Sequence, residues 1–374
     1  MSADWLLQHA EKENKRFKRD KPTRYRMPPY HPDTYVQDLT RSPYFDALIT
    51  LRHFVQAASR RYFELEQGAR NVDLFMLTPS VSSPMGPGSD SEPIHLEFGG
   101  NKTHLVDSSQ FGFEPLLFHG QKMVYCYLPS MRGENPDARH LNQFYHCECE
   151  MVGDLQGVMQ VAEGYVKALS QMLLCLPNVV GVMSTNAAES RTVFLRITQT
   201  DVFPRVSFEE VCELLRQQPD ADCLVRLTSH GRDLTAEGEH RFAKLRGLQL
   251  PFWITHYDRD RVPFYQQPVA GFPDKVENAD LIFPALTSTG FGGEVLGCGQ
   301  RQHSSQEMRA SLRRQDDISA EPYEWYLALR DDPAYKPTSG FGLGIERFIA
   351  WALAKENIRD VSLYPRLKGI RTYP

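Results

Sequence analysis

The sequence has no long apolar segment. None of its apolar runs approaches the roughly 18–20 residues that a membrane-spanning helix requires, and its N-terminus has no apolar signal core. These absences argue against an integral membrane protein and against a secreted one. We therefore predict a cytoplasmic protein that has no membrane partner.

Paired cysteines are also absent. The seven cysteines form no CxxC pair, and most of them stand among apolar residues. Cys147 and Cys149 would share one face of a strand, which leaves a zinc site as an alternative, but tetrahedral zinc needs further ligands. The spacing favours buried free thiols in a reducing compartment.

A net positive charge is missing, since 42 lysines and arginines stand against 47 acidic residues, which gives −5. No overall positive field would therefore attract a nucleic acid. Basic residues concentrate at positions 12–26, within a charged and proline-rich segment, residues 1–44. We interpret this segment as a poorly packed N-terminal extension, and contacts with phosphates are the alternative.

One stretch, residues 131–151, combines charged and aromatic residues in a way that a core strand does not need. Two apolar runs, 124–131 and 144–151, flank a polar loop with turn-forming residues, so they predict a β-hairpin. The hairpin would carry these candidate ligands: Arg132, Glu134, Arg139, His140 and Phe144. Guanidinium groups match phosphate oxygens and an aromatic ring can stack on a base, which points to a nucleoside triphosphate. A surface hairpin with solvated charges is the alternative.

These hairpin residues belong to a set of three motifs. Arg132-Gly133-Glu134 precedes Arg139-His140-Leu141 and Phe144, residues 294–301 form an acidic, glycine-rich segment, and residues 339–366 carry Arg347 after a glycine-rich run. The first segment resembles motif 2 of class II aminoacyl-tRNA synthetases of the aspartyl, asparaginyl and lysyl group. The second resembles the strand that binds metal and substrate in these enzymes, and the third resembles their motif 3. The SSQFGFE segment, residues 108–114, is similar to that of asparaginyl-tRNA synthetases. The similarity extends from about Phe45 to the C-terminus.

The resemblance implies an α/β (α+β) fold, an antiparallel sheet flanked by helices, with a catalytic domain at residues 45–374. It also implies a mainly helical insertion at about 177–250, whose polar residues we interpret as structural. Apolar spacing by itself predicts amphipathic helices at 45–67 and 154–176. The family places its motif 1 helix and strand, here 45–67 and 72–79, at a dimer interface, so we expect a homodimer. A helix packed only on its own sheet is the alternative.

The resemblance also assigns substrate ligands. It implies contacts with ATP by Arg132, Glu134, Arg139, His140, Phe144, Glu294 and Arg347, and contacts with an amino acid by Glu92, Ser108, Gln110 and Arg301. Antiparallel pairing would bring Asp280 beside Glu294, and two carboxylates suit a Mg²⁺ ion that bridges phosphates, although about six more residues separate them than in asparaginyl enzymes. Structural alternatives are a carboxylate partner for Arg301, a helix cap for Ser108 and a solvated loop position for Glu92.

The chemistry implied by the resemblance is formation of an acyl-adenylate, with ATP and Mg²⁺ as cofactors. Arg132 would neutralise charge that develops on the α-phosphate, Arg347 would hold the γ-phosphate, and Glu294 would carry the metal. The protein would then be an AMP-forming ligase that activates aspartate, asparagine or a related amino acid.

Two departures from the family bear on the acceptor of the acyl group. The 44 residues before the catalytic domain show no alternating strands from which to build an anticodon-binding barrel, and Pro93 and Ile94 replace a glycine-rich run. The preceding loop, residues 80–93, more nearly resembles that of archaeal asparagine synthetases. We therefore predict transfer to ammonia or a small amine, as in an amide ligase. Aminoacylation of tRNA is the alternative, and a non-catalytic regulator is a third interpretation.

Overall fold

The computed structural model describes residues 3–20, 23–84 and 91–373 of the chain. Its centre is an eight-stranded sheet in the order β1-β5-β6-β15-β14-β13-β10-β7. The strands span these residues: β1, Arg70–Asn71; β5, Met123–Met131; β6, Gln143–Val152; β15, Thr338–Gly344; β14, Gly293–Gln300; β13, Asn278–Phe283; β10, Phe252–Thr255; β7, Arg205–Ser207. The central strands pair antiparallel, whereas the edge strands β1 and β7 pair in parallel with their neighbours. The predicted antiparallel sheet flanked by helices is confirmed.

The predicted hairpin is confirmed as β5 and β6, in which Met131 lies opposite Gln143. Side chains alternate along β6, so that Cys147 and Cys149 enter the apolar core and Glu148 faces the other way. Both cysteines are free thiols, and the residues that the structure describes contain no cluster of three side chains suited to a metal. The zinc alternative therefore has no support within the described part of the chain.

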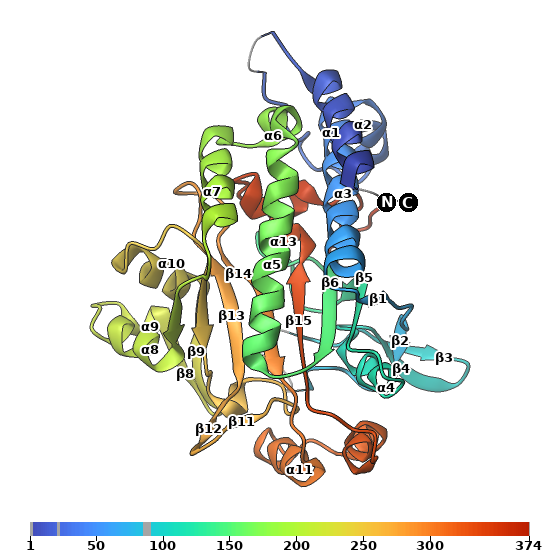
Figure 1. The fold of residues 1–374 in the computed structure, drawn as a ribbon, viewed down its shortest axis with the longest axis vertical. Coiled ribbons are helices and arrows are strands. Elements are labelled where there is room, and N and C mark those ends of the chain that lie inside the picture. Colours follow the sequence, from blue (N-terminus) through green and yellow to red (C-terminus); the bar gives the residue numbers. More distant parts are fainter. Residues whose placement is uncertain (1–2, 21–22, 85–90, 374) are drawn as a thin grey trace.

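Helices cover one face of the sheet (Figure 1). Helices α3 (Pro43–Arg61) and α5 (Leu155–Leu174) pack against each other, α5 also contacts β14 and β15, and α7 (Ala187–Gln199) packs on α5. The helix expected at 45–67 corresponds to α3 and the π-helical turn that follows it, η1 (Tyr62–Glu66). The two predicted amphipathic helices thus form the layer that buries the core side of the sheet.

Helix α5 begins where the sequence predicts. The carboxylate of Asp154 accepts a hydrogen bond from the backbone N–H of Gly157 at 2.9 Å, which caps the helix.

Of the described helices, none is by itself long and apolar enough to cross a membrane. Helix α5 together with α6 (Pro177–Met183) has the length and composition of a membrane span, but the two helices are bent by 88° relative to each other.

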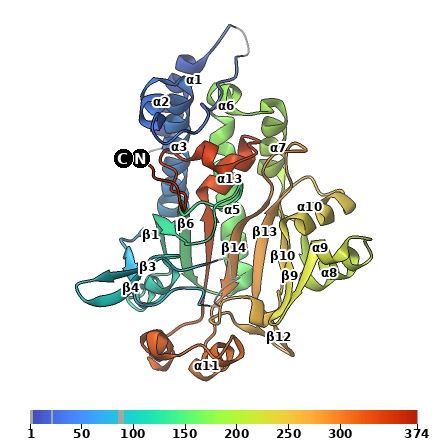
Figure 2. The ribbon, with the colours of Figure 1, turned by 180° about the vertical axis from the view of Figure 1, so that it is seen from behind.

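The opposite face of the sheet is seen in Figure 2. Helix α13 (Ile345–Ala352) lies near one end of the strands and α11 (Ser305–Arg314) near the other. Strand β15 runs directly into α13, so Arg347 falls in the first turn of the helix. A Cβ atom on Gly340 of β15 would overlap the side chains of Glu150 and Arg301, so glycine is required there for close packing.

The expected strand at 72–79 is not continuous. After β1 the chain leaves the main sheet, and it regains strand structure only at β2 (Leu77–Thr78), which pairs with β4 (Asn101–Leu105) and through it with β3 (His95–Phe98). Leu74 and Phe75 pack against Gly112 in the connection. Strands β3 and β4 pair antiparallel, with Phe98 opposite Asn101.

The segment 177–250 is mainly helical but also contributes strands. It contains α6, α7, α8 (Phe208–Arg216), α9 (Ala221–Leu224) and α10 (Ala236–Leu245), together with the edge strand β7 and a hairpin, β8 (Val225–Thr228) and β9 (Gly231–Leu234). Helices α8 and α10 bury Phe208 and Phe242 against Phe252 of β10 in a second apolar cluster. The segment therefore extends the end of the main sheet.

The N-terminal residues pack better than we expected. Helix α1 (Ala3–Phe17) buries Leu6, Ala10 and Phe17 in the main core and contacts α3 and α6. Their spacing places these three residues on one apolar face of the helix. The overall composition of the segment does not reveal this face, because lysines and arginines surround it. The prediction of a poorly packed extension is therefore wrong for α1. Residues 21–22 of the basic stretch lie outside the described residues.

Candidate active site

A cavity of about 310 Å³ opens on the sheet face that carries Glu148, away from α5. Its wall contains every predicted site residue except Glu92: Ser108, Gln110, Arg132, Glu134, Arg139, His140, Phe144, Asp280, Glu294, Arg301 and Arg347. These residues come from segments far apart in the chain. The sheet, through its glycine-rich strands β14 and β15, brings them together.

One part of the cavity gathers the predicted triphosphate ligands. Arg347 donates from Nη1 to the carboxylate of Glu294 at 3.0 Å and to its backbone carbonyl at 3.2 Å. The guanidinium of Arg132 lies over the ring of Phe144, 5.3 Å from its centroid. Burial acts to raise the pKa of Glu294, but the charges of Arg347, Arg132 and Arg139 outweigh it and lower the pKa below its ordinary value. Glu294 is therefore an ionised carboxylate among several cations.

The loop of the hairpin is ordered by its own side chains. Asn142 donates from Nδ2 to the carbonyl oxygens of Arg132 and Glu134 at 2.8 and 2.7 Å. Asp137 accepts from the backbone N–H of Arg139 at 2.6 Å and lies 2.9 Å from Nδ1 of His140. Burial and the charge of nearby Arg347 lower the pKa of His140. The loop thus presents its candidate ligands in fixed positions.

Asp280 and Glu294 reach the same point over the sheet. A Cβ atom on Gly297 would lie 3.2 Å from an oxygen of Asp280 and 3.4 Å from an oxygen of Glu294, so glycine leaves the space that both carboxylates border. The register pairs Asp280 directly with Gly297. The predicted approach of the two acids is therefore present, because β13 and β14 pair directly and residues 284–292 form the connection outside them. Two hard oxygen ligands in a polar cavity fit Mg²⁺.

The segment 177–250 also reaches the cavity. Glu239 of α10 lies 3.6 Å from Nη2 of Arg139 and accepts the backbone N–H of Glu294 at 3.2 Å. Burial raises the pKa of Glu239 to about 7, with the charge of Arg139 acting against the rise. Our interpretation of the polar residues of this segment as purely structural is incomplete, because Glu239, Arg232 and Asp233 line the cavity wall. No pattern in the sequence distinguishes Glu239 from the other acids of its helix.

Arg301 has both a structural partner and a face toward the cavity. Its Nε and Nη2 donate to the two carboxylate oxygens of Glu150 at 2.9 and 2.7 Å. Its remaining terminal nitrogen, Nη1, has no hydrogen-bond partner within the described structure. The structural alternative is therefore present, since Glu150 fixes one edge of the guanidinium. The contact with an amino acid stays a prediction.

The SSQ segment also contributes to the cavity wall, through Ser108 and Gln110. Ser108 donates its hydroxyl to Glu148, and the backbone N–H of Ser109 donates to the same carboxylate at 2.8 Å. Gln110 accepts a hydrogen bond from the hydroxyl of Tyr265 at 2.7 Å. Sequence reasoning missed Glu148, although its alternation with Cys147 along β6 was a signal that it faces away from the core.

Glu92 is the predicted ligand that the structure does not bring to the cavity. Its side chain is 54% exposed and lies 3.3 Å from the ammonium of Lys368. Its backbone carbonyl accepts the N–H of Gly133 at 2.6 Å, which fixes the chain beside the hairpin loop. Residues 85–90, which precede it, lie outside the described residues. The neighbouring Ser91, which is buried, lines the cavity instead.

Comparisons with known proteins cover most of the chain. Residues 31–368 match the family model described as tRNA synthetases class II (D, K and N). The chain therefore belongs to this family and is an ATP-dependent, AMP-forming ligase. The match begins before Phe45, earlier than the motifs indicated.

Among similar proteins are two asparagine–tRNA ligases. That of Herpetosiphon aurantiacus is 30% identical over 347 residues, which cover 89% of this chain and 72% of the relative. That of Pyrococcus furiosus is 31% identical over 336 residues, which cover 89% and 71%. The crystal structure of asparaginyl-tRNA synthetase from Pyrococcus horikoshii, complexed with asparaginyl-adenylate, superposes with a TM-score of 0.79 at 27% identity and covers 91% of this chain and 73% of that one.

Proposed function

We propose that the protein activates asparagine with ATP and transfers the asparaginyl group to tRNA. The observation that supports this most strongly is the clustering in one cavity of Arg132, Arg347 and the paired acids Asp280 and Glu294, together with Arg301. The similar asparagine–tRNA ligases favour tRNA over the amine acceptor that the sequence predicted.

In the first step the α-carboxylate of asparagine forms a bond to the α-phosphorus of ATP, and the bond from that phosphorus to the β-phosphate bridging oxygen breaks. Arg132 stabilises charge on the α-phosphate. Arg347 gives up its hydrogen bonds to Glu294 and donates to the oxygens of the γ-phosphate, which it holds in place. Mg²⁺ held by Asp280 and Glu294 would add positive charge at the phosphates. The protein supplies position and charge and needs no nucleophile of its own.

A second candidate is the amide ligase, with ammonia or a small amine as acceptor. It uses the same adenylate and differs only in the second step. The observation in its favour is the position of Glu92 outside the cavity, beside Lys368.

We also propose that the protein forms a homodimer through α3, whichever acceptor it uses. Ile49 of α3 is 51% exposed, so this helix has an apolar residue available for a partner. Sedimentation measures the oligomeric state.

The proposal is tested by ATP–pyrophosphate exchange with each amino acid in the absence of RNA, followed by acylation with tRNA or with ammonium. We expect asparagine-dependent exchange and stable asparaginyl-tRNA. Exchange without any tRNA charging, together with amide formation from ammonium, would replace the tRNA reading by the amide ligase. Absence of exchange with every amino acid would reject both.

A further inference from the structure

Glu239 of α10 is a buried acid of the segment 177–250 to which no motif draws attention. Its side chain is 10% exposed, whereas that of Glu237 on the same helix is 61% exposed. Burying a carboxylate is costly unless hydrogen bonds and opposite charge compensate for its lost hydration. The carboxylate of Glu239 finds this compensation at Arg139 and Glu294, which both lie outside the segment. The residue therefore connects the segment to the cavity.

One oxygen of Glu239 serves both partners. Oε2 accepts the backbone N–H of Glu294 at 3.2 Å and lies 3.6 Å from Nη2 of Arg139. The three residues come together at Gly293, where a Cβ atom would overlap the carboxylate of Glu239 and the guanidinium of Arg139. Gly293 also has a φ of 103°, which residues with a side chain rarely adopt. Glycine at this position therefore lets the two charged groups approach each other beside the start of β14.

The guanidinium of Arg139 has further contacts that fix it. It lies over the ring of Phe291, 5.0 Å from the centroid, and its Nη1 donates to the backbone carbonyl of Gly292. The side chain is still 22% exposed and borders the cavity. An arginine held by a carboxylate, a carbonyl and an aromatic ring keeps a defined orientation, so it loses little conformational entropy when it meets a phosphate.

The helix that carries Glu239 is firmly packed. Thr235 caps α10 by accepting the N–H of Gly238 at 3.1 Å. A Cβ atom on Gly238 would overlap the carbonyl of Leu224, so the helix packs directly on α9 at this point. Phe242, one turn later, is buried in the second apolar cluster. The position of Glu239 is therefore set by packing on its own helix.

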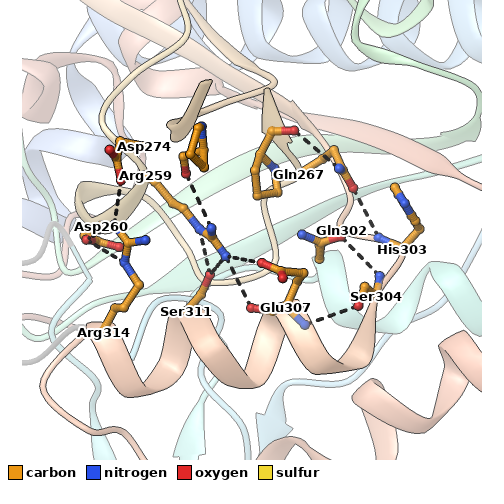
Figure 3. A network of polar contacts seen from close by, with 12 residues as sticks. Arg259, Asp260, Gln267, Asp274, Gln302, His303, Ser304, Glu307, Ser311 and Arg314 are labelled. Atoms are coloured by element: carbon orange, nitrogen blue, oxygen red, sulfur yellow. Dashed lines mark hydrogen bonds and ion pairs between the residues drawn. The ribbon is translucent and has the colours of Figure 1, made fainter. Parts of the chain in front are cut away.

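The strand before α10 is tied to the rest of the protein by ion pairs. Asp233 of β9 pairs with Arg261 at 2.7 Å. Two residues earlier in the chain, the buried Arg259 donates to Ser311 at 2.9 Å and to the carboxylate of Glu307 at 3.0 Å, both on α11 (Figure 3). A side chain that orients another side chain needs a rigid support of this kind.

We propose that Glu239 is a positioning residue for the triphosphate part of the cavity: it holds the guanidinium of Arg139 and the backbone of Glu294 in the arrangement that ATP requires. Without the carboxylate, Arg139 keeps its charge but loses an anchor, and the start of β14 loses a hydrogen bond. This inference rests on the proposed activation of an amino acid by ATP and adds a residue from outside the three motifs. It applies to either acceptor, because both reactions begin with the same adenylate.

The test is Glu239→Ala, measured by ATP–pyrophosphate exchange. We expect KM for ATP to rise about tenfold and KM for asparagine to change by less than about twofold, because the residues that Glu239 holds are predicted to contact ATP. Glu237→Ala, on the exposed side of α10, is the matched control and should leave both constants unchanged. Equal increases in the two KM values, or a KM for ATP that stays at the wild-type value in Glu239→Ala, would overturn the inference.

A double-mutant cycle separates positioning from general damage to the site. In a protein that already carries Arg139→Ala, the further change Glu239→Ala should raise KM for ATP by much less than it does in the wild-type protein, because the side chain that Glu239 orients is gone. Equal effects in the two backgrounds would contradict a role that acts through Arg139.

Calorimetric binding of ATP to the full chain gives a readout that does not require activity, and the affinity should fall about tenfold in Glu239→Ala. If Glu239→Ala does not fold, Glu239→Met, which keeps the length of the side chain and removes its acceptors, is measured in its place. Wild-type exchange together with an unaltered KM for ATP in the variant rejects only the role of Glu239. A wild-type protein that neither binds ATP nor catalyses exchange with any amino acid rejects the proposed function as well.

Discussion

Two arginine–glutamate pairs stand in the same cavity and are built differently. Arg301 and Glu150 have side chains that are 2% and 0% exposed and meet through two parallel hydrogen bonds. Arg347 and Glu294 have side chains that are 21% and 35% exposed and share one carboxylate contact. The first pair is a fixed part of the wall, whereas the second can exchange protein contacts for those of a ligand.

The difference follows from where each pair lies. Glu150 is on a central strand and meets Arg301 over Gly340, where any side chain would collide with the pair. Arg347 stands on the first turn of α13, where the chain leaves the sheet, and Glu294 is close to the start of β14. Sheet centres bury charges only when those charges are fully paired, while the ends of strands leave room for ligands.

The largest expected effect comes from breaking the buried pair. Arg301→Leu leaves the buried carboxyl group of Glu150 without its partner, so we expect the free energy of unfolding to fall by about 3–5 kcal/mol in urea denaturation. Replacing both residues by leucine should restore part of this loss. The exposed pair Arg309–Glu324 provides the control, and Arg309→Leu should change stability by less than about 1 kcal/mol. A small loss in Arg301→Leu would contradict the assignment of this pair as a fixed part of the wall.

The open pair should behave in the opposite way. Arg347→Ala and Arg132→Ala should leave the melting temperature nearly unchanged and cost at least ~2 kcal/mol of transition-state binding in ATP–pyrophosphate exchange, because each removes a charged contact with phosphate. Arg313→Ala, on the exposed side of α11, is the control. Exchange close to wild type in both variants would reject the triphosphate site, and loss of folding in either would remove the contrast with Arg301.

A third cluster of charged residues, around Asp258, joins the segment 177–250 to the rest of the protein. Asp258 accepts two hydrogen bonds from the side chain of Arg232 and one from Lys275, and these outweigh burial and lower its pKa to about 2. A carboxyl whose pKa is lower in the folded state stabilises the fold above its unfolded pKa, near 3.8, and loses this contribution as the pH falls toward 2.

Asp258→Asn should therefore lower the free energy of unfolding by about 1 kcal/mol at pH 5–7, after allowance for solvent screening, with a gap to wild type that narrows toward pH 2. Urea denaturation over this pH range measures the gap. Asp274→Asn is the control, because the Asp274 side chain is 80% exposed. A gap that stays constant with pH would show that the carboxylate charge of Asp258 does not carry the effect.

Local patterns were sufficient for much of the fold and for most of the site. The spacing of apolar residues located α3 and α5, turn residues located the hairpin, and the motifs named Arg132 and Arg347, which the structure brings into one cavity. Patterns of this kind depend on a few neighbouring residues. The composition of residues 1–44 misled for the same reason, because the apolar face of α1 has meaning only against α3 and α6.

The sequence by itself determined which charged residues the motifs contain and the order in which strands and helices follow one another, because both depend on nearby residues. Only the tertiary structure decided that Glu150 fixes one edge of Arg301, that Glu239 reaches Arg139 and that Glu92 stays outside the cavity. Each of these depends on segments far apart in the chain, and on glycines whose missing side chains let those segments meet.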